Sequence, residues 1–180
     1  MKNLRNMAQG EIRSNVTFEE FATVFKVYEG YPFCESWSED ELKEEYAEYS
    51  HNGGWLFGYY LDGKCVAILT LHPMIKGAHP VVYPEDKKVM YLSDIATLSE
   101  CRGRGIATQL FHFALRHTEV LGYDYIYLRT NFDEKESMSA GIAKKCGFER
   151  IWDICQEVER KRIDGNVRKD LRMFMEKKLK

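Results

Sequence analysis

The sequence lacks both an excess of charge of one sign and a long apolar run. Lys and Arg total 26 against 28 Asp and Glu, which gives a net charge of −2. Balanced, scattered charge does not create the field that draws a protein to nucleic acid or to anionic lipid. No stretch approaches the roughly 18 apolar residues of a transmembrane helix. We therefore expect neither a nucleic-acid partner nor a membrane partner.

The sequence also lacks the cysteine patterns of disulfide-bonded and zinc-binding proteins. Its five cysteines are odd in number, and no two have CxxC spacing. His112 and His117, five apart on a predicted helix, do not share a face, so no metal is expected. Residues 1–14 contain no apolar segment of the kind that directs export. The sequence thus predicts a cytoplasmic protein with reduced cysteines.

Residues that build a core are plentiful. Of the 180 residues, 44% are apolar and 13% are aromatic, and the length is that of about one domain. No repeat or linker interrupts the chain, and the four prolines fall in two short stretches that are predicted to be loops. We expect residues 1–180 to form a single domain.

Periodicity predicts the elements. Thr17 and Ser38 each precede a Glu by three residues, which is the capping box of a helix start. Asp62-Gly63 and Asp164-Gly165 are turn signals between β-rich runs. Helices are expected at 17–30, 38–51, 106–121 and 137–146, strands at 55–60, 65–71, 89–97, 125–130, 148–158 and 171–176, and a loop at 73–88. With a further strand before the first helix, the order is β-α-α-β-β-β-α-β-α-β-β, which predicts an α/β (α+β) fold with a mixed, mostly antiparallel sheet of about seven strands flanked by about four helices.

A glycine-containing turn between the 89–97 strand and the 106–121 helix is the most informative segment. Gly103 and Gly105 lie directly before the helix, beside Arg102 and Arg104. A helix N-terminus presents unpaired N–H groups and the positive end of the dipole, and glycines let an anion approach the backbone. The pattern favours a phosphate or pyrophosphate ligand. The alternative is an ordinary strand-to-helix turn with solvated arginines.

Familiar motifs for other chemistries are absent. There is no GxxxxGK[ST] sequence, and the GxGxxG of dinucleotide-binding folds would need a glycine where Thr108 stands. The acid expected at the end of the next strand is also missing, because Asp124 lies at its beginning. No GxSxG nucleophile elbow occurs. Nicotinamide binding, ATP binding and nucleophilic hydrolysis are therefore disfavoured.

Residues 102–107 match the pattern [Q/R]-x-x-G-x-[G/A], and at this point the chain resembles the GNAT superfamily of acyl-CoA-dependent N-acetyltransferases. Ile95-Ala96-Thr97 stands where that family has I-A-V in its fourth strand. Residues 145–149, Lys-Cys-Gly-Phe-Glu, look like its k-x-G-F-e exit into the sixth strand. The resemblance is sharp over about 89–152, and it implies a GNAT-like fold.

The resemblance also implies a reaction, in which an amine attacks the thioester of the cosubstrate acetyl-CoA directly. It implies that the backbone of Ile95, Ala96 and Thr97 holds the pantetheine arm, with one strand amide available to the oxyanion. The pyrophosphate would lie on Arg102, Gly103, Arg104, Gly105, Ile106 and Ala107. The implied activity is N-acetyl transfer to the primary amine of a small molecule or peptide.

The chain departs from the family pattern N-x-x-A-x-x-x-Y-x-x-x-G-F. Ala143 stands in the place of the tyrosine that protonates the leaving thiolate, where the family register directs it at the thioester sulfur, and Glu136 replaces the asparagine. Asn131, at the end of the 125–130 strand, is a candidate to replace that asparagine. A thiol with a pKa near ~8.5 is a tolerable leaving group even unprotonated. The missing tyrosine motivates the alternative function, a catalytically weak CoA-binding sensor or scaffold.

Asp94 is the candidate general base, since it is the acid nearest the expected thioester and several small-amine acetyltransferases of the family carry an acid there. Strict alternation puts Tyr91, Ser93 and Ile95 on one face of the strand and Asp94 on the other, although a bulge would change this. If Asp94 faces a helix, its role is to cap it or to pair with an arginine. Ser93 or Tyr91 is then the candidate to relay a proton through water.

Acceptor specificity is expected to come from the loops at 29–40 and 72–88. The first combines aromatic side chains with four acids, which suits a cationic amine. Equally, its aromatics bury against the sheet and its acids stabilise the N-terminus of the second helix. The sequence leaves a homodimer open.

Overall fold

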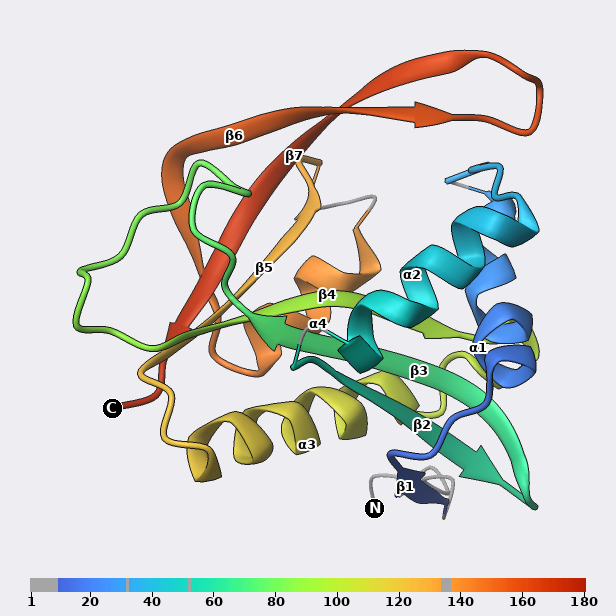
Figure 1. Ribbon diagram of the computed structural model, residues 1–180, viewed down its shortest axis with the longest axis horizontal. Coiled ribbons are helices and arrows are strands. Elements are labelled where there is room, and N and C mark those ends of the chain that lie inside the picture. Colours follow the sequence, from blue (N-terminus) through green and yellow to red (C-terminus); the bar gives the residue numbers. More distant parts are fainter. Residues whose placement is uncertain (1–9, 32, 52, 134–136) are drawn as a thin grey trace, which may run out of the picture.

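The computed structural model describes residues 10–31, 33–51, 53–133 and 137–180, which form one sheet with helices on both faces (Figure 1). The sheet has seven strands in the order β1-β2-β3-β4-β5-β7-β6, and only β4 and β5 pair in parallel. The strands are β1 (Glu11–Arg13), β2 (Trp55–Leu61), β3 (Lys64–Pro73), β4 (Val89–Thr97), β5 (Tyr125–Asn131), β6 (Glu149–Lys161) and β7 (Val167–Lys178). The helices are α1 (Phe18–Phe25), α2 (Glu39–His51), α3 (Ile106–Val120) and α4 (Met138–Lys145). The predicted mixed, mostly antiparallel α/β fold is confirmed.

Both predicted capping boxes are present at the helix starts. The Thr17 hydroxyl accepts from the Glu20 amide at 3.2 Å, and the Glu20 carboxylate accepts from the Thr17 amide at 2.9 Å. Ser38 and Glu41 repeat the arrangement before α2. The first predicted helix is shorter than expected, because its last turn, Lys26–Glu29, is a 3₁₀ helix.

Alternation along β2 separates the helices onto the two faces of the sheet. The ring of Phe57 packs edge-on against Phe113 of α3, with 4.8 Å between centroids. The Tyr60 hydroxyl instead donates to Glu20 of α1, at 2.8 Å. Because successive strand side chains point to opposite faces, α1 and α3 cover opposite sides of the sheet.

β4 and β5 diverge soon after they begin to pair. Their parallel register runs from Val89 opposite Tyr125 to Leu92 opposite Leu128 and stops there. Beyond Leu92, β4 stays paired with β3, and beyond Leu128, β5 stays paired with β7. The result is a gap in the middle of the sheet that opens toward the start of α3 (Figure 1).

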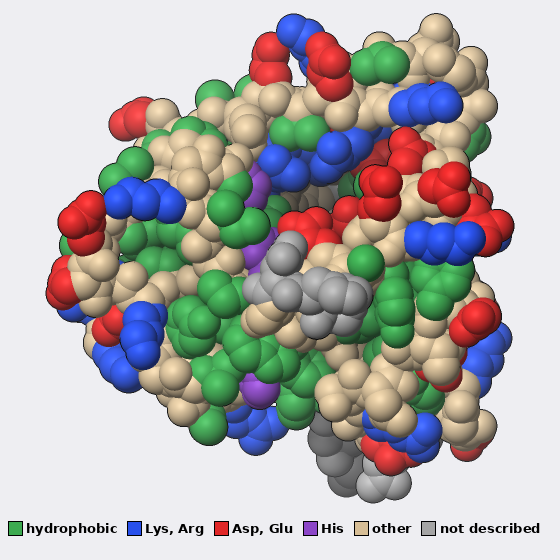
Figure 2. All heavy atoms as spheres, in the orientation of Figure 1, with side chains coloured by type: hydrophobic (Ala, Val, Ile, Leu, Met, Phe, Trp, Pro, Cys, Tyr) green, Lys and Arg blue, Asp and Glu red, His purple; other side chains and the backbone are tan. Residues whose placement is uncertain are grey.

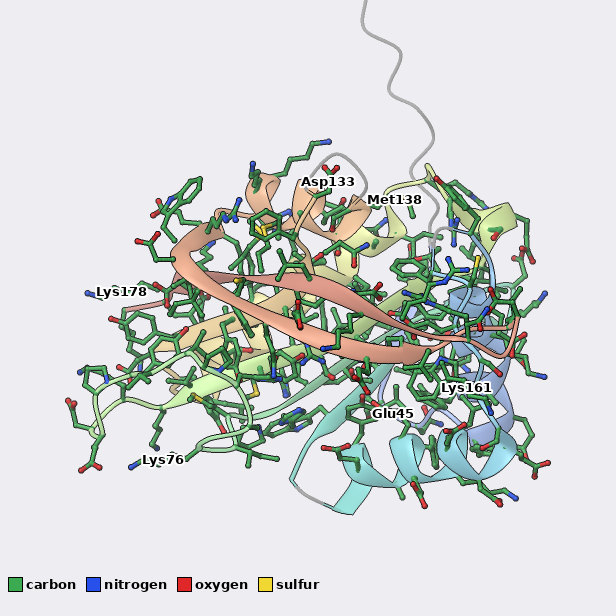
Figure 3. All side chains as sticks on the ribbon, turned by 90° about the horizontal axis from the view of Figure 1, so that it is seen from above. Glu45, Lys76, Asp133, Met138, Lys161 and Lys178 are labelled. Atoms are coloured by element: carbon green, nitrogen blue, oxygen red, sulfur yellow. The ribbon has the colours of Figure 1, made fainter. Side chains whose placement is uncertain are left out.

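β6 and β7 form a hairpin that is longer than the sequence predicted. Gly165 lies at its turn with φ +83°, and its amide donates to the Arg162 carbonyl at 2.9 Å. The hairpin projects past the sheet toward α1 and α2, with Lys161 near its tip (Figure 3). There the Ser36 amide donates to the Lys161 carbonyl at 2.9 Å, and the Ile163 amide donates to the Cys34 carbonyl at 3.0 Å.

The predicted 73–88 loop begins one residue late, since β3 extends through Pro73. His72 is therefore a buried strand residue rather than a loop residue, and its ring packs on Tyr91. His79 lies in the loop, with its Nδ1 2.9 Å from the Tyr127 hydroxyl, and burial, helped by Arg129, lowers its pKa to about 4. In the described part of the chain, no helix has the length and apolarity to span a membrane.

Candidate active site

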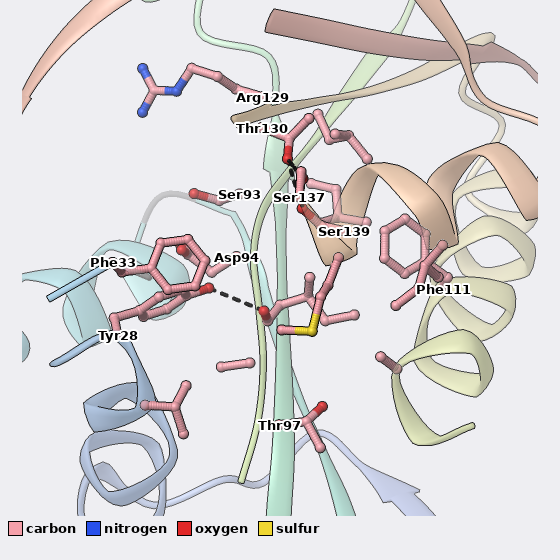
Figure 4. Close-up of a pocket in the computed structure, with 18 of the residues that line it drawn as sticks. Tyr28, Phe33, Ser93, Asp94, Thr97, Phe111, Arg129, Thr130, Ser137 and Ser139 are labelled. Carbon is pink, nitrogen blue, oxygen red and sulfur yellow. Dashed lines mark hydrogen bonds between the residues drawn. The ribbon is translucent and has the colours of Figure 1, made fainter. Parts of the chain in front are cut away.

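A cavity of about 660 Å³ lies where β4 and β5 diverge. One side is formed by the glycine turn and the first turn of α3, together with α4. The other side is formed by α2, the 25–37 segment and the β6–β7 hairpin. Figure 4 shows side chains from the 25–37 segment, α3, β5, α4 and the residue before α4 around β4. The glycine turn and the candidate base therefore open into one space.

The glycine turn has the geometry of an anion site. Gly103 and Gly105 have φ of +73° and +79°, which side chains with a Cβ rarely adopt, and no heavy atom lies within 4 Å of the position of a Cβ at either. Gly105 is the N-cap of α3, and no side chain caps the helix there. The first amides of α3 are thus available to an external acceptor. Arg102 lines the cavity, whereas Arg104 is exposed and is not among its lining residues.

β4 presents backbone groups to the gap. The Leu98 amide donates back to Val66 of β3 at 2.9 Å, but the Ile95 carbonyl accepts from the Tyr28 hydroxyl at 3.1 Å (Figure 4). The Thr97 carbonyl is 3.4 Å from Nε of Arg102. Because the N–H and C=O of one strand residue point to the same edge, the amides of Ile95 and Thr97 also face the gap.

A β-bulge places Ser93 and Asp94 on the same side of β4. Leu71 pairs with Leu92 and Leu69 pairs with Ile95, so two residues of β4 stand opposite Thr70 alone. The Asp94 amide donates to the Thr70 hydroxyl at 2.9 Å. Strict alternation, which would have separated the two side chains, does not hold here.

Asp94 belongs to a chain of proton-carrying groups that reaches α2. The Tyr49 hydroxyl lies 2.8 Å from Oδ2 of Asp94, within hydrogen-bond distance of Oε1 of Glu45, and 3.4 Å from Oγ of Ser93. A phenol has one proton and donates to one acid only. The second contact is a hydrogen bond when the other carboxyl is itself protonated. When one of the two carboxyls is protonated, the group of Glu45, Tyr49 and Asp94 therefore carries two protons, one on the phenol and one on that carboxyl.

Glu45 is the group that holds this proton. Burial, and then the negative charge of Asp94, raise the pKa of Glu45 to about 7. Burial and the same charge raise the pKa of Tyr49 well above its usual value, so the phenol stays protonated. At neutral pH Glu45 is therefore partly protonated, and the contacts of the Tyr49 hydroxyl connect it to Asp94 at the cavity.

The stability of the protein should fall as the pH rises through the titration of Glu45. Its carboxyl has a pKa of 4.5 in a model peptide and about 7 in the folded chain, so between these values the folded state binds more protons than the unfolded state. The stabilisation is complete below about pH 4.5 and is lost as the pH rises through about 7, by up to about 3 kcal/mol. Urea unfolding across this range measures it.

Glu45→Gln should flatten this dependence, because the amide does not titrate. Glu44→Gln, at an exposed position next to it on α2, is the matched control and should keep the slope. An unchanged slope in the Glu45 variant would assign the pH dependence to another group.

The wall opposite β4 carries hydroxyl groups rather than a tyrosine. Oγ1 of Thr130 lies 2.5 Å from Oγ of Ser137 and 2.7 Å from Oγ of Ser139 (Figure 4). Ala143 is fully buried and is not among the cavity-lining residues, which corrects the expectation that it faces the reacting sulfur. The reason is the pitch of α4, which turns Ala140 and Ala143 into the core and Ser139 toward the cavity. Glu136 lies outside the described residues.

The 29–40 loop has residues of both kinds that its sequence suggested, some that stabilise the fold and one acid that lines the cavity. Trp37 packs on Phe25 at 5.0 Å between ring centroids, and Glu39 and Asp40 lie in the first turn of α2, as the structural reading expected. Glu35, however, is buried and lines the cavity, where burial raises its pKa. It lies 3.6 Å from Nη2 of Arg172.

Most of the sequence-predicted residues share the cavity. Its lining includes Ser93, Asp94, Ile95, Ala96, Thr97, Arg102, Gly103, Gly105, Ile106, Ala107 and Asn131. The Asn131 side-chain oxygen accepts from Arg172. Glu45, Tyr49 and Arg129 were missed. A signal for the first two existed, because Leu42, Glu45 and Tyr49 lie three and four residues apart, which puts an acid between two apolar residues on one helix face.

The comparisons agree with this geometry. The model of the acetyltransferase (GNAT) family matches residues 18–148. The chain belongs to this family of acetyltransferases, which binds an acyl-CoA and an acceptor. A search of curated proteins finds no match.

Solved structures with a similar fold are acetyltransferases at low sequence identity. An N-acetyltransferase from Staphylococcus aureus Mu50 has a TM-score of 0.69 and 17% identity, covering 96% of this chain and 99% of that chain. A phosphinothricin acetyltransferase from Sinorhizobium meliloti in complex with acetyl-CoA has a TM-score of 0.68 and 14% identity, covering 94% of this chain and 88% of that chain. The ribosomal-protein-S18-alanine N-acetyltransferase from Escherichia coli has a TM-score of 0.67 and 15% identity, covering 95% of this chain and 94% of that chain.

Proposed function

We propose that the chain is a cytoplasmic N-acetyltransferase that moves an acetyl group from acetyl-CoA to a primary amine by direct attack. The observation that carries the proposal is the shared cavity, in which an uncapped, glycine-preceded helix N-terminus and the Asp94 chain open into one space. Five free cysteines are consistent with a reducing compartment. We also propose that residues 1–180 are a single domain that needs no metal.

The chain's own residues fit acetyl-CoA as a substrate. The pyrophosphate would bind the amides of the glycine turn and of Ile106 and Ala107, with Arg102 as a charged donor. The pantetheine arm would extend along Ile95, Ala96 and Thr97, whose backbone groups face the gap. The thioester supplies an activated acetyl group, and a gap-facing amide of β4 is positioned to donate to its carbonyl oxygen.

Asp94 takes the proton of the attacking amine in this proposal. Its carboxylate lies in the cavity and is held by the Tyr49 hydroxyl and the Thr70-bonded backbone. Ser93, next to it on the same side of the bulge, orients the amine or a bridging water. The Thr130, Ser137 and Ser139 hydroxyls are the candidates to protonate the leaving thiolate, in place of the absent tyrosine.

Thiol release from acetyl-CoA over a panel of amines tests the activity. The similar structures include an enzyme named for phosphinothricin and one named for a ribosomal-protein alanine, so the panel needs both small molecules and peptides. Amino acids, polyamines, aminoglycosides and N-terminal peptides should yield at least one acceptor with turnover well above hydrolysis. CoA binding without turnover on any of them would favour the sensor or scaffold instead.

A further inference from the structure

Three arginines, Arg129, Arg160 and Arg172, line the side of the cavity near Asp94, where the acceptor would bind. The acids that contact them do not balance all three charges. Arg172 lies 3.0 Å from Asp170 and 3.6 Å from Glu35, and its charge is matched. Arg160 reaches the same Glu35 only at 3.8 Å, and its buried Nε has no hydrogen-bond partner among the described residues. Positive charge is therefore left over on the hairpin.

Arg129 adds a second unmatched charge from β5. Its Nη1 donates to the side-chain oxygen of Gln156 at 3.0 Å, which is a neutral amide. None of the ion pairs in the described residues includes Arg129. Figure 4 shows its side chain extending toward the side of Ser93, while the next residue, Thr130, points the other way to α4. Arg129 thus lies on the same side of the sheet as the candidate base.

The facing wall carries the opposite charge. Glu48 of α2 and Asp94 of β4 line the cavity across from the arginines, next to Glu45, which is only partly ionised at neutral pH. Figure 2 shows the hollow with Lys and Arg side chains along its upper rim and Asp and Glu side chains below and to the right. A ligand with a cation at one end and an anion at the other would satisfy both walls, whereas a simple amine leaves the arginines unpaired at a desolvation cost.

We infer that the acceptor is a free amino acid, bound with its amine at Asp94 and its carboxylate between Arg129 and Arg160. The inference rests on the proposed acetyl transfer for the reaction but not for the binding. A guanidinium binds a carboxylate through paired, charge-assisted hydrogen bonds, which the neutral carbonyl of a peptide or amide does not reproduce. The carboxylate thus selects a free amino acid over a peptide N-terminus.

The reaction balances with these groups. The ammonium of the amino acid gives one proton to Asp94, and the freed lone pair forms the bond to the thioester carbon. The carbon–sulfur bond breaks, the sulfur leaves with the electron pair, and it takes up one proton. The second amine proton leaves as the amide forms and balances the proton taken up by the sulfur, so that the proton on Asp94 is the one released to solvent overall. The products are an N-acetyl amino acid, which keeps the carboxylate but no longer carries a cation, and CoA.

The test compares the twenty protein amino acids with their carboxamides, which differ only in the anionic group. For at least one pair, kcat/KM for the amino acid should exceed that for the carboxamide by about tenfold or more, as expected for a buried charge-assisted contact. Arg129→Gln and Arg160→Gln should each lower kcat/KM for the amino acid by about ten- to a hundredfold and leave the carboxamide unchanged. Arg168→Gln is the matched control, since Arg168 is on the same hairpin with 62% of its side chain exposed.

Carboxamides that react as well as the amino acids, or arginine variants that lower both substrates equally, would overturn the inference while leaving acetyl transfer intact. A binding measurement separates the two proposals if no amine is acetylated. In the presence of CoA, an amino acid should then raise the melting temperature more than its carboxamide, and Arg129→Gln should remove the difference. This result would keep the amino-acid site and reject the activity, and its absence would reject the site.

Discussion

Asp94→Asn should lower kcat by about 10²-fold or more while leaving the affinity for CoA unchanged. The amide keeps the shape of the side chain and its contact with Tyr49 but does not accept the proton of the amine, and a positioned base contributes typically ~10²–10⁴-fold. Steady-state turnover, with calorimetry for CoA, measures both quantities. Asp86→Asn is the matched control, because 73% of that side chain is exposed in the 74–88 loop.

The Tyr49 hydroxyl separates a proton-accepting role of Asp94 from a structural one. Tyr49→Phe removes the link to Glu45 and should lower kcat and shift the pH profile, with the fold intact. Tyr46→Phe is its control on the same helix, since that hydroxyl donates to the Val16 carbonyl at 2.9 Å, away from the cavity. If Asp94→Asn is fully active, or if its loss follows unfolding, the acid is structural and Ser93 becomes the better candidate.

Gly105→Val should lower the affinity for CoA by at least about a hundredfold, since it removes two or more charge-assisted contacts between backbone amides and the pyrophosphate. Gly105 is the N-cap of α3, and the space where a Cβ would lie is open to the ligand. Its φ of +79° adds a strain of about 1–2 kcal/mol for a residue with a side chain. Calorimetry with CoA gives the affinity, and urea unfolding gives the strain.

Gly165→Val isolates the strain from the loss of contact. Gly165 has φ +83° and an equally open Cβ position, but it lies at the turn of the β6–β7 hairpin. Its variant should lose similar stability and keep its affinity for CoA. Unchanged affinity in a folded Gly105→Val protein would remove the glycine turn from the CoA site.

Local signals predicted most of the fold because short-range chemistry fixes those elements. Thr17 and Ser38 mark helix starts, since their hydroxyls bond amides three residues away. Asp62 and Gly63 have φ of +49° and +78°, which is the backbone that their hairpin turn requires. The glycine turn could likewise be predicted, because adjacent residues determine its geometry. These are Gly103 and Gly105, with their left-handed φ, and the uncapped start of α3.

The acceptor side was harder to predict, because distant residues define it. The bulge that brings Ser93 and Asp94 together depends on Thr70 in another strand, and alternation alone misplaced one of them. The environment of Glu45 depends on Asp94, which lies 49 residues later in the sequence and contacts the hydroxyl of Tyr49. The direction of Ala143 follows from how α4 packs, which the family register did not capture.

The divergence of β4 and β5 divides the sheet into two plates. One holds β1 to β4 and the other holds β5, β7 and β6, and they share a seam of only four registered residue pairs. So short a seam resists rotation of one plate against the other less than a continuous ladder does. A ligand bound in the gap contacts both parts of the sheet, would hold them at one angle to each other, and would set the width left for a second ligand.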